Sequence, residues 1–180
     1  MKNKKIIAIL GLPGSGKTEV IEYLIKKFNW PKVYFGEVTF DEIKKRKLPI
    51  NEKNERLVRE AIRKKYGLDY YARQVYKKIN KLKNKKIILL ESLYGWDEYK
   101  YLKNKFKNNL FTIAVYASPR ARYQRLESRN YRPLTSRQAI SRDYAQIENL
   151  HQGGPIAMAN FTIINQGDLA NLHKQIDQIL

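Results

Sequence analysis

The stretch Gly11-Leu12-Pro13-Gly14-Ser15-Gly16-Lys17-Thr18 decides the fold of this chain. A glycine, four residues and then Gly-Lys-Thr is the spacing of the Walker A phosphate-binding loop. The apolar run 6–10 precedes it and the amphipathic pattern 17–28 follows it, so the loop joins a buried strand to a helix. Glycines let the backbone curl until successive amides face the phosphates, and the helix start adds its positive dipole end. We therefore expect this loop to hold the phosphates of ATP or another nucleoside triphosphate.

Side chains at and beyond the loop should complete the phosphate site. Lys17 is expected to reach the β- and γ-phosphates, and the Thr18 hydroxyl is placed to ligate Mg²⁺. The apolar run 87–90 delivers Glu91 to the carboxyl edge of the sheet, where ligands bind in such folds. Glu91 is predicted to orient a Mg²⁺-bound water or the attacking group; a helix-capping or exposed glutamate is the alternative. An ordinary glycine turn would need no Lys-Thr pair, so the whole set favours nucleotide binding by Gly11, Gly14, Ser15, Gly16, Lys17 and Thr18.

Apolar runs alternate with helical patterns along the whole chain, which indicates βαβ units on a parallel sheet. The predicted strands are 6–10, 33–35, 87–90, 111–116 and 161–164. The predicted helices are 17–28, 37–46, 52–66, 69–82, 96–106, 119–128, 137–150 and 168–180. Segment 129–136 is predicted to be a mobile loop. The fold class is therefore α/β, a three-layer α/β/α sandwich around a five-stranded parallel sheet.

Length and composition limit the classes of protein further. A chain of 180 residues is long enough for one substantial core and short for two, so we expect a single domain. The absence of cysteine excludes disulfides, thiolate metal sites and cysteine nucleophiles, and fits a reducing compartment. The basic N-terminus leads into an apolar run too short for a signal peptide, and no stretch approaches a membrane span. We expect a cytoplasmic protein without a membrane partner. The two histidines, His151 and His173, lack the sequence spacing of metal ligands, so we expect them at the surface.

The formal net charge of +19 predicts a positive field that attracts polyanions such as nucleotides, coenzymes or nucleic acid. A compositional bias toward Lys, Asn, Ile and Tyr, with lysines on outer helix faces, is the alternative explanation. Nucleic acid is therefore a possible partner, and the oligomeric state is not determined by the sequence.

The chain resembles nucleoside-monophosphate kinases and dephospho-coenzyme A kinases, and more closely the adenylate-kinase-related P-loop proteins common in archaea. The likeness covers nearly the whole length. It is carried by the motifs at 11–20, Gly36-Glu37-Val38, Arg63 with Tyr66-Gly67, Ala117-Ser118-Pro119, Arg142-Asp143, and Ile163-Ile164-Asn165 with Gly167.

This resemblance implies a helical acceptor-binding insert at about 37–84 and a lid at about 129–142. It also implies that Asn165 and Gly167 contact the base of the phosphate donor; a simple helix start before Asp168 is the alternative for Asn165. Two departures concern the acceptor side. The related group has Asp-Gly-Ile-Arg where this chain has Glu91-Ser92-Leu93-Tyr94, and an arginine where it has Phe40. The acceptor therefore need not be AMP.

Six arginines cluster between 122 and 142 in a chain that otherwise prefers lysine, namely Arg122, Arg125, Arg129, Arg132, Arg137 and Arg142. Planar bidentate cations suit the charge that phosphoryl transfer spreads over the moving group. Arg125, Arg129 and Arg142 are the predicted phosphate contacts, whereas a solvated basic helix face is the alternative for the set. Arg142 and Asp143 are also placed to form a local ion pair.

Acceptor contacts are expected in the insert. Arg59 and Arg63 lie one helical turn apart and are predicted to hold an acceptor phosphate, with Tyr66 available to stack on a base or sugar. Arg59 is equally compatible with a helix surface. Glu37 resembles the carboxylate that dephospho-coenzyme A kinases place near the acceptor hydroxyl, which suggests a general base; a carboxylate at a helix N-terminus is the alternative.

The sequence thus predicts a Mg²⁺- and ATP-dependent phosphotransferase acting on a small phosphorylated acceptor, most simply a nucleoside monophosphate. Dephospho-coenzyme A kinase is the alternative within enzymes. A nucleotide-responsive nucleic-acid-binding protein and a P-loop scaffold without turnover are the alternatives from other classes.

Overall fold

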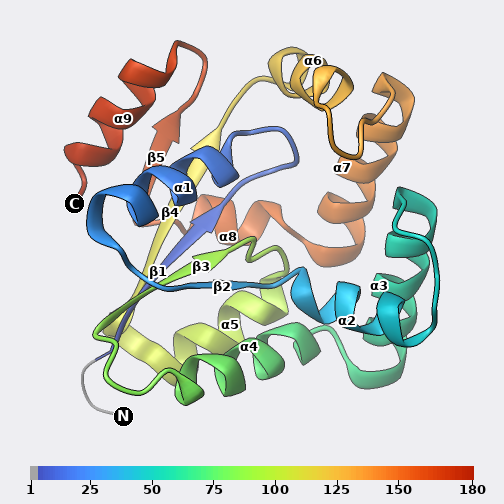
Figure 1. The fold of residues 1–180 in the computed structure, drawn as a ribbon, viewed down its shortest axis with the longest axis horizontal. Helices are drawn as coiled ribbons and strands as arrows, with labels where there is room; N and C mark the ends of the chain where they lie inside the picture. The colour runs from blue at the N-terminus through green and yellow to red at the C-terminus, as the bar shows by residue number, and fades with distance from the viewer. Residues whose placement is uncertain (1–3) are drawn as a thin grey trace.

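A computed structural model describes residues 4–180 and contains one five-stranded parallel sheet (Figure 1). The strands are β1 (Lys5–Leu10), β2 (Lys32–Tyr34), β3 (Ile87–Glu91), β4 (Leu110–Tyr116) and β5 (Phe161–Ile164), in the spatial order β2-β3-β1-β4-β5. β1 lies at the centre, with Ile9 opposite Glu91 on β3 and Leu10 opposite Ala114 on β4. The predicted α/β fold is confirmed, with strand bounds within one residue of the predicted ones.

Alternation along β1 divides the core between the two faces of the sheet. Ile6, Ala8 and Leu10 face α2 (Glu37–Lys45), α3 (Glu52–Tyr66), α4 (Tyr70–Lys81) and α5 (Trp96–Phe106). Ile7 and Ile9 face α1 (Lys17–Phe28) and α9 (Leu169–Asp177). Figure 1 shows α1 and α9 on one side of the strands and α4 and α5 on the other.

Two further helices, α6 (Pro119–Ser128) and α7 (Ser136–Leu150), stand beside the carboxyl ends of the strands. They have a small apolar core of their own, made by Leu126, Leu134 and Ala139. Leu134, which lies in the segment expected to be a mobile loop, is buried, and its backbone N–H donates to the Leu126 carbonyl of α6 at 3.0 Å.

Two short helices were not predicted. α8 (Gly153–Ala157) and a 3₁₀ turn at Lys107–Asn109 are too short to show an amphipathic period, and Gly-Gly-Pro resembles a turn. α9 ends at Asp177, three residues before its predicted end at Leu180. Within residues 4–180, no helix is both long enough and apolar enough to cross a bilayer.

Candidate functional site

The loop between β1 and α1 adopts a backbone that only glycine tolerates at three positions. Gly11, Gly14 and Gly16 have φ of +137°, +78° and +100°. An added Cβ would lie 2.4 Å from the Val115 carbonyl oxygen at Gly11 and 2.1 Å from the Asn165 amide nitrogen at Gly16. The glycines of the Walker A spacing are therefore fixed by neighbouring elements as well as by the turn itself.

Three buried side chains hold this loop from outside. Gln152 donates to the Gly11 carbonyl at 3.0 Å, and Asn165 donates from Nδ2 to the Ser15 carbonyl at 2.8 Å. Arg122 donates from Nη1 to the Pro13 carbonyl at 3.1 Å. All three are at most 7% exposed, so the loop is braced by α8, by the end of β5 and by α6.

Arg122 is also the centre of a buried ion pair. Its Nη1 and Nη2 donate to the two Asp143 carboxylate oxygens at 3.0 and 2.7 Å, and its Nε donates to the Ala117 carbonyl at 3.2 Å. Arg122 is 2% and Asp143 4% exposed. The expected local pair between Arg142 and Asp143 is wrong, because Asp143 turns inward to Arg122 while Arg142 extends to Glu52 at 2.9 Å.

Lys17 is a buried ammonium group without a carboxylate partner among the described residues. Its Nζ donates to the Leu12 carbonyl at 3.0 Å, and the residue is 8% exposed. Burial, together with the charge of Arg142, lowers the pKa of Lys17 to about 7 against the opposing effect of Glu91. A buried cation in this state is stabilised by an incoming anion, so the site fits a polyphosphate.

Thr18 and Glu91 meet where a metal ion would sit beside such a polyphosphate. The Thr18 hydroxyl donates to Glu91 Oε1 at 3.1 Å, and Lys32 holds Glu91 Oε2 at 2.9 Å. Residues 4–180 contain no cluster of three or more acidic, histidine or cysteine side chains able to bind a metal alone. One hydroxyl and one carboxylate suit Mg²⁺, which takes its remaining ligands from phosphates and water.

Aromatic rings at positions 40 and 94 lie next to cations. The Tyr94 ring lies 5.9 Å from Lys17 Nζ, and the Phe40 ring lies 5.2 Å from the Arg132 guanidinium. Burial raises the pKa of Tyr34, with Tyr94 and Glu91 adding to the effect, so this phenol remains protonated. Phe40 and Tyr94, the two positions at which the related archaeal proteins have arginine, thus place aromatic rings next to Arg132 and Lys17.

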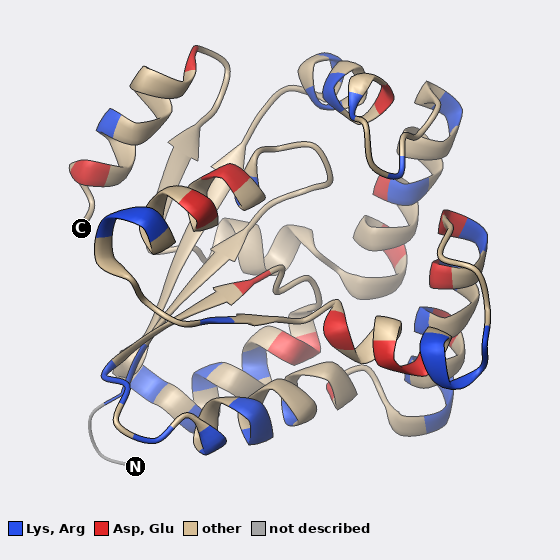
Figure 2. Ribbon diagram, viewed as in Figure 1, with Lys and Arg blue, Asp and Glu red and all other residues tan. Residues whose placement is uncertain are grey.

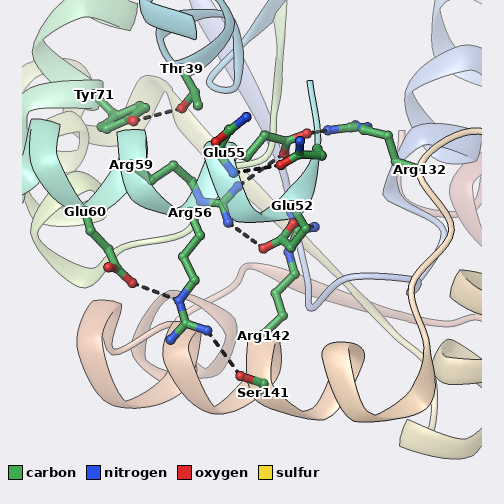
Figure 3. A network of polar contacts seen from close by, with 12 residues as sticks. Thr39, Glu52, Glu55, Arg56, Arg59, Glu60, Tyr71, Arg132, Ser141 and Arg142 are labelled. Carbon is green, nitrogen blue, oxygen red and sulfur yellow. Dashed lines mark hydrogen bonds and ion pairs between the residues drawn. The ribbon is translucent and has the colours of Figure 1, made fainter. Parts of the chain in front are cut away.

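A network of carboxylates and arginines joins α3 to the segment 129–142 (Figure 3). Glu52 pairs with Arg59 at 2.8 Å and with Arg142 at 2.9 Å. Glu55 pairs with Arg59 at 3.3 Å and with Arg132 at 2.6 Å. Three of the arginines in this region are therefore already bound by two carboxylates from the first turns of α3.

A cavity of about 440 Å³ opens between α3 and α7. Five cations line it, against two carboxylates from Glu52 and Glu60, and the cations are Arg56, Arg59, Arg63, Lys64 and Arg142. Tyr94 lines the same cavity, and its ring centroid lies 5.9 Å from Lys17 Nζ, so one wall of the cavity is formed by a neighbour of the phosphate-loop lysine. Positively charged side chains therefore outnumber carboxylates in its lining.

The predicted residues divide between those that reach the cavity and those that do not. Arg63 lines it but donates to Glu98 at 2.8 Å and is 8% exposed, so it also ties α3 to α5. Tyr66 stacks on Tyr70 with ring centroids 4.6 Å apart and does not line the cavity. Glu37 is exposed and pairs with Lys78 at 2.7 Å.

The residues that were predicted to contact the phosphate donor lie beyond the loop. Arg125 donates to the Asn165 carbonyl at 3.0 Å, while Gly167 is exposed next to Asn171. Asn165 is not the helix cap, because Asp168 accepts from the Asn171 N–H and caps α9. Arg129 donates from Nε to the Arg132 carbonyl at 2.6 Å, and burial together with Arg142 and Arg132 lowers its pKa.

Gln152, Glu52 and Glu55 were not predicted as parts of the site. The two glutamates show a weak signal, since they stand four and seven residues before Arg59 on one helix face. No local pattern marks Gln152, which comes from a helix of five residues. His173 stacks on Tyr23 with centroids 4.0 Å apart, and His151 is the C-cap of α7 in a left-handed conformation.

The glycine loop, the central parallel β1 and the Thr18–Glu91 pair define a P-loop protein of the kinase-like α/β class. The chain belongs to the AAA domain family, which it matches over residues 7–151, and to the UPF0200 proteins. It is 30% identical to the UPF0200 protein of Methanocaldococcus jannaschii over 178 residues, covering 97% of this chain and 88% of that one. It is 28% identical to that of Thermococcus kodakarensis over 183 residues, covering 97% and 98%.

Solved structures share the fold. A shikimate kinase from Acinetobacter baumannii matches with a TM-score of 0.57 and 18% identity, over 98% of this chain and 92% of that one. A gluconokinase from Sinorhizobium meliloti matches with a TM-score of 0.53 and 14% identity, over 99% and 97%. These likenesses confirm the expected P-loop α/β fold.

Proposed function

We propose that this protein is a Mg²⁺-dependent phosphotransferase that moves the γ-phosphoryl group of ATP to a nucleoside monophosphate. The observation that carries the proposal is a cation-lined cavity next to the loop: Arg142 and Tyr94 line it, and the Tyr94 ring lies 5.9 Å from Lys17 Nζ. An acceptor phosphate there would lie among arginines, and its nucleoside would contact the apolar wall made by Leu68 and Leu150.

In this proposal each side chain has a defined role. Lys17 neutralises the phosphates of the donor, and its low pKa means that it takes up a proton when they bind. Thr18 and Glu91 would hold Mg²⁺, which would supply charge neutralisation between the phosphates. Arg129 and Arg142 would stabilise the transferred group, and Arg125 with Asn165 would face the donor base.

Two larger parts complete the proposal. Helices α2 to α4 serve as the acceptor-binding insert at about 37–84, with Arg59 and Arg63 toward the acceptor. Residues 129–142 serve as a lid, which contacts the insert through Arg132 and Arg142. A lid in this position would exclude water from the transferred group and limit ATP hydrolysis.

Dephospho-coenzyme A kinase activity is the second candidate. Glu37 stands shortly after β2, in the position from which a carboxylate would act as general base on a ribose hydroxyl. The pair between Glu37 and Lys78 argues against it, since that carboxylate would have to leave its partner to act. Glu37→Gln with unchanged turnover would remove the base assignment.

The test is Mg²⁺-ATP consumption with chromatographic identification of the products. The acceptor panel contains all ribo- and deoxyribonucleoside monophosphates and dephospho-coenzyme A. It also contains shikimate and gluconate, because proteins named for kinases of these acids share the fold. A nucleoside diphosphate formed from one acceptor, and absent with Lys17→Ala, supports the proposal. Phosphorylation of a non-nucleotide acid, or ATP consumption without any acceptor product, refutes it.

A further inference from the structure

Positive charge is unevenly distributed along this chain. Residues 70–90 contain seven Lys or Arg and no Asp or Glu, and residues 99–110 contain four and none. These two segments thus hold eleven of the 36 positive side chains and none of the 17 negative ones. Their charge is therefore not balanced locally, as it is around Glu52 and Glu55.

Only three of these eleven cations form an ion pair within residues 4–180, in each case with a carboxylate outside residues 70–90 and 99–110. Arg73 pairs with Asp69, Lys78 with Glu37 and Lys100 with Asp97. The other eight make no ion pair with any residue of 4–180, and we call them the lysine face: Lys77, Lys81, Lys83, Lys85, Lys86, Lys103, Lys105 and Lys107.

The structure brings the two charged segments together. α4 and α5 pack through Tyr76, whose ring lies 6.1 Å from that of Tyr101, and Lys105 lies within 5.8 Å of both rings. The turn after α4 returns to the start of β3, where the Lys5 N–H donates to the Lys86 carbonyl at 2.8 Å. Figure 2 shows the blue segments gathered on α4, on α5 and on this turn.

The lysine face lies at the opposite end of the sheet from the nucleotide site. Lys85 and Lys86 precede β3, whereas Glu91 ends it; the phosphate loop follows β1, which runs parallel to β3. Helix dipoles account for part of the charge, since Lys81 and Lys103 stand in the last turns of α4 and α5. They do not account for the lysines in the turn, which belong to no helix.

The surroundings of these lysines select the kind of partner. Between residues 69 and 115 no large apolar side chain is fully exposed, and Lys105 lies over the half-buried rings of Tyr76 and Tyr101, so charge rather than apolar surface dominates this face. Lysine is a flexible point charge that suits phosphate oxygens without reading bases. We propose that the lysine face binds the phosphate backbone of double-stranded nucleic acid, independently of the nucleotide site.

The test is fluorescence anisotropy with labelled duplexes of about 20 base pairs, as RNA and as DNA, between 50 and 200 mM salt. If four lysines contact phosphates together, this rise in salt weakens binding about 150-fold. The test variant carries Lys81→Gln, Lys83→Gln, Lys85→Gln and Lys86→Gln. The matched control carries the same charge change at exposed lysines of other helices, Lys26→Gln, Lys44→Gln, Lys53→Gln and Lys174→Gln.

We expect the test variant to bind the duplex at least about 20-fold more weakly than the wild type at 100 mM salt, with a shallower salt dependence. The control variant and Lys17→Ala should bind within about threefold of the wild type. If the test and control variants lost the same amount of duplex affinity, the net charge of the protein alone would explain the binding, and the proposal would be overturned. It is also overturned if no duplex binds at 50 mM salt, if single strands bind more tightly, or if anionic phosphatidylserine vesicles compete the duplex away. The RNA and DNA arms identify which duplex is preferred.

Discussion

The buried ammonium of Lys17 makes nucleotide binding dependent on pH. Its pKa is about 7 in the free protein, because burial and Arg142 disfavour the charged form. Bound phosphates place negative charge against it and restore a pKa near the ordinary value of about 10. Binding should therefore take up a proton at any pH between these two values. The affinity should fall as the pH rises through this interval, because the free protein then loses the proton that the complex needs.

The size of the effect follows from the two pKa values. At pH 8 the free ammonium is about one tenth protonated and the bound one almost fully, so binding should take up about 0.9 proton. Between pH 7.5 and pH 9 the ratio of these populations predicts an affinity about 20-fold weaker. The phosphates do not contribute, because their last pKa of about 6 lies below this range.

Isothermal titration calorimetry measures this uptake directly. Binding of a non-hydrolysable ATP analogue at pH 8 is recorded in buffers of different ionisation enthalpy, and the slope against that enthalpy gives the number of protons. Lys17→Arg serves as the control, since arginine stays charged and should bind, however weakly, without proton uptake. A wild-type uptake near zero, together with equal affinities at pH 7.5 and pH 9, would refute the argument from burial.

Three substitutions test the packing of the loop. Lys17→Met should raise the free energy of unfolding at pH 7 by up to about 4 kcal/mol, and the gain should nearly vanish at about pH 11.5, where the wild-type lysine is neutral in both states; urea unfolding at the two pH values measures it. Arg122→Leu should cost about 3–5 kcal/mol because it strands the Asp143 carboxylate, and adding Asp143→Leu should recover much of the loss; a fully additive double variant would contradict the pairing. Gly16→Ala should abolish nucleotide binding in the same calorimetric assay while Gly153→Ala, whose added Cβ meets nothing within 4 Å, leaves it unchanged.

Hydrophobic periodicity was enough to predict the sheet, and the spacing of glycines before Lys17 and Thr18 was enough to predict the phosphate loop. From Ile6 to Leu10 strand β1 is buried on both faces and is a continuous apolar run, and the glycine spacing depends on backbone geometry that no other residue satisfies. The bracing of the loop was not predictable in this way. Arg122 shares a helix face with Arg125 in the sequence pattern, yet it turns inward because α6 packs its first turns against Pro13 and Ala117.

Ion pairs between residues far apart in the sequence were not predicted either, because they also depend on how distant elements pack together. Glu52 and Glu55 resemble ordinary acidic residues at a helix start, which favour the dipole of α3. Their partners Arg132 and Arg142 lie 77 and 90 residues away, and only the approach of α7 to α3 brings them within 3 Å. The sequence indicated a cluster of arginines but not the carboxylates that hold it.

Those carboxylates affect how a phosphate would enter the proposed acceptor site. Arg59, Arg132 and Arg142 together carry three positive charges, and the two glutamates that bind them carry two negative ones. An incoming ligand must therefore compete with the two carboxylates for the arginine side chains. A neutral sugar or base carries no negative charge with which to displace them. A phosphate dianion brings more charge and three acceptor oxygens, so it is the kind of group for which the exchange is favourable. The same network that keeps α3 and α7 together without a ligand would thus select for a phosphorylated acceptor over its unphosphorylated counterpart.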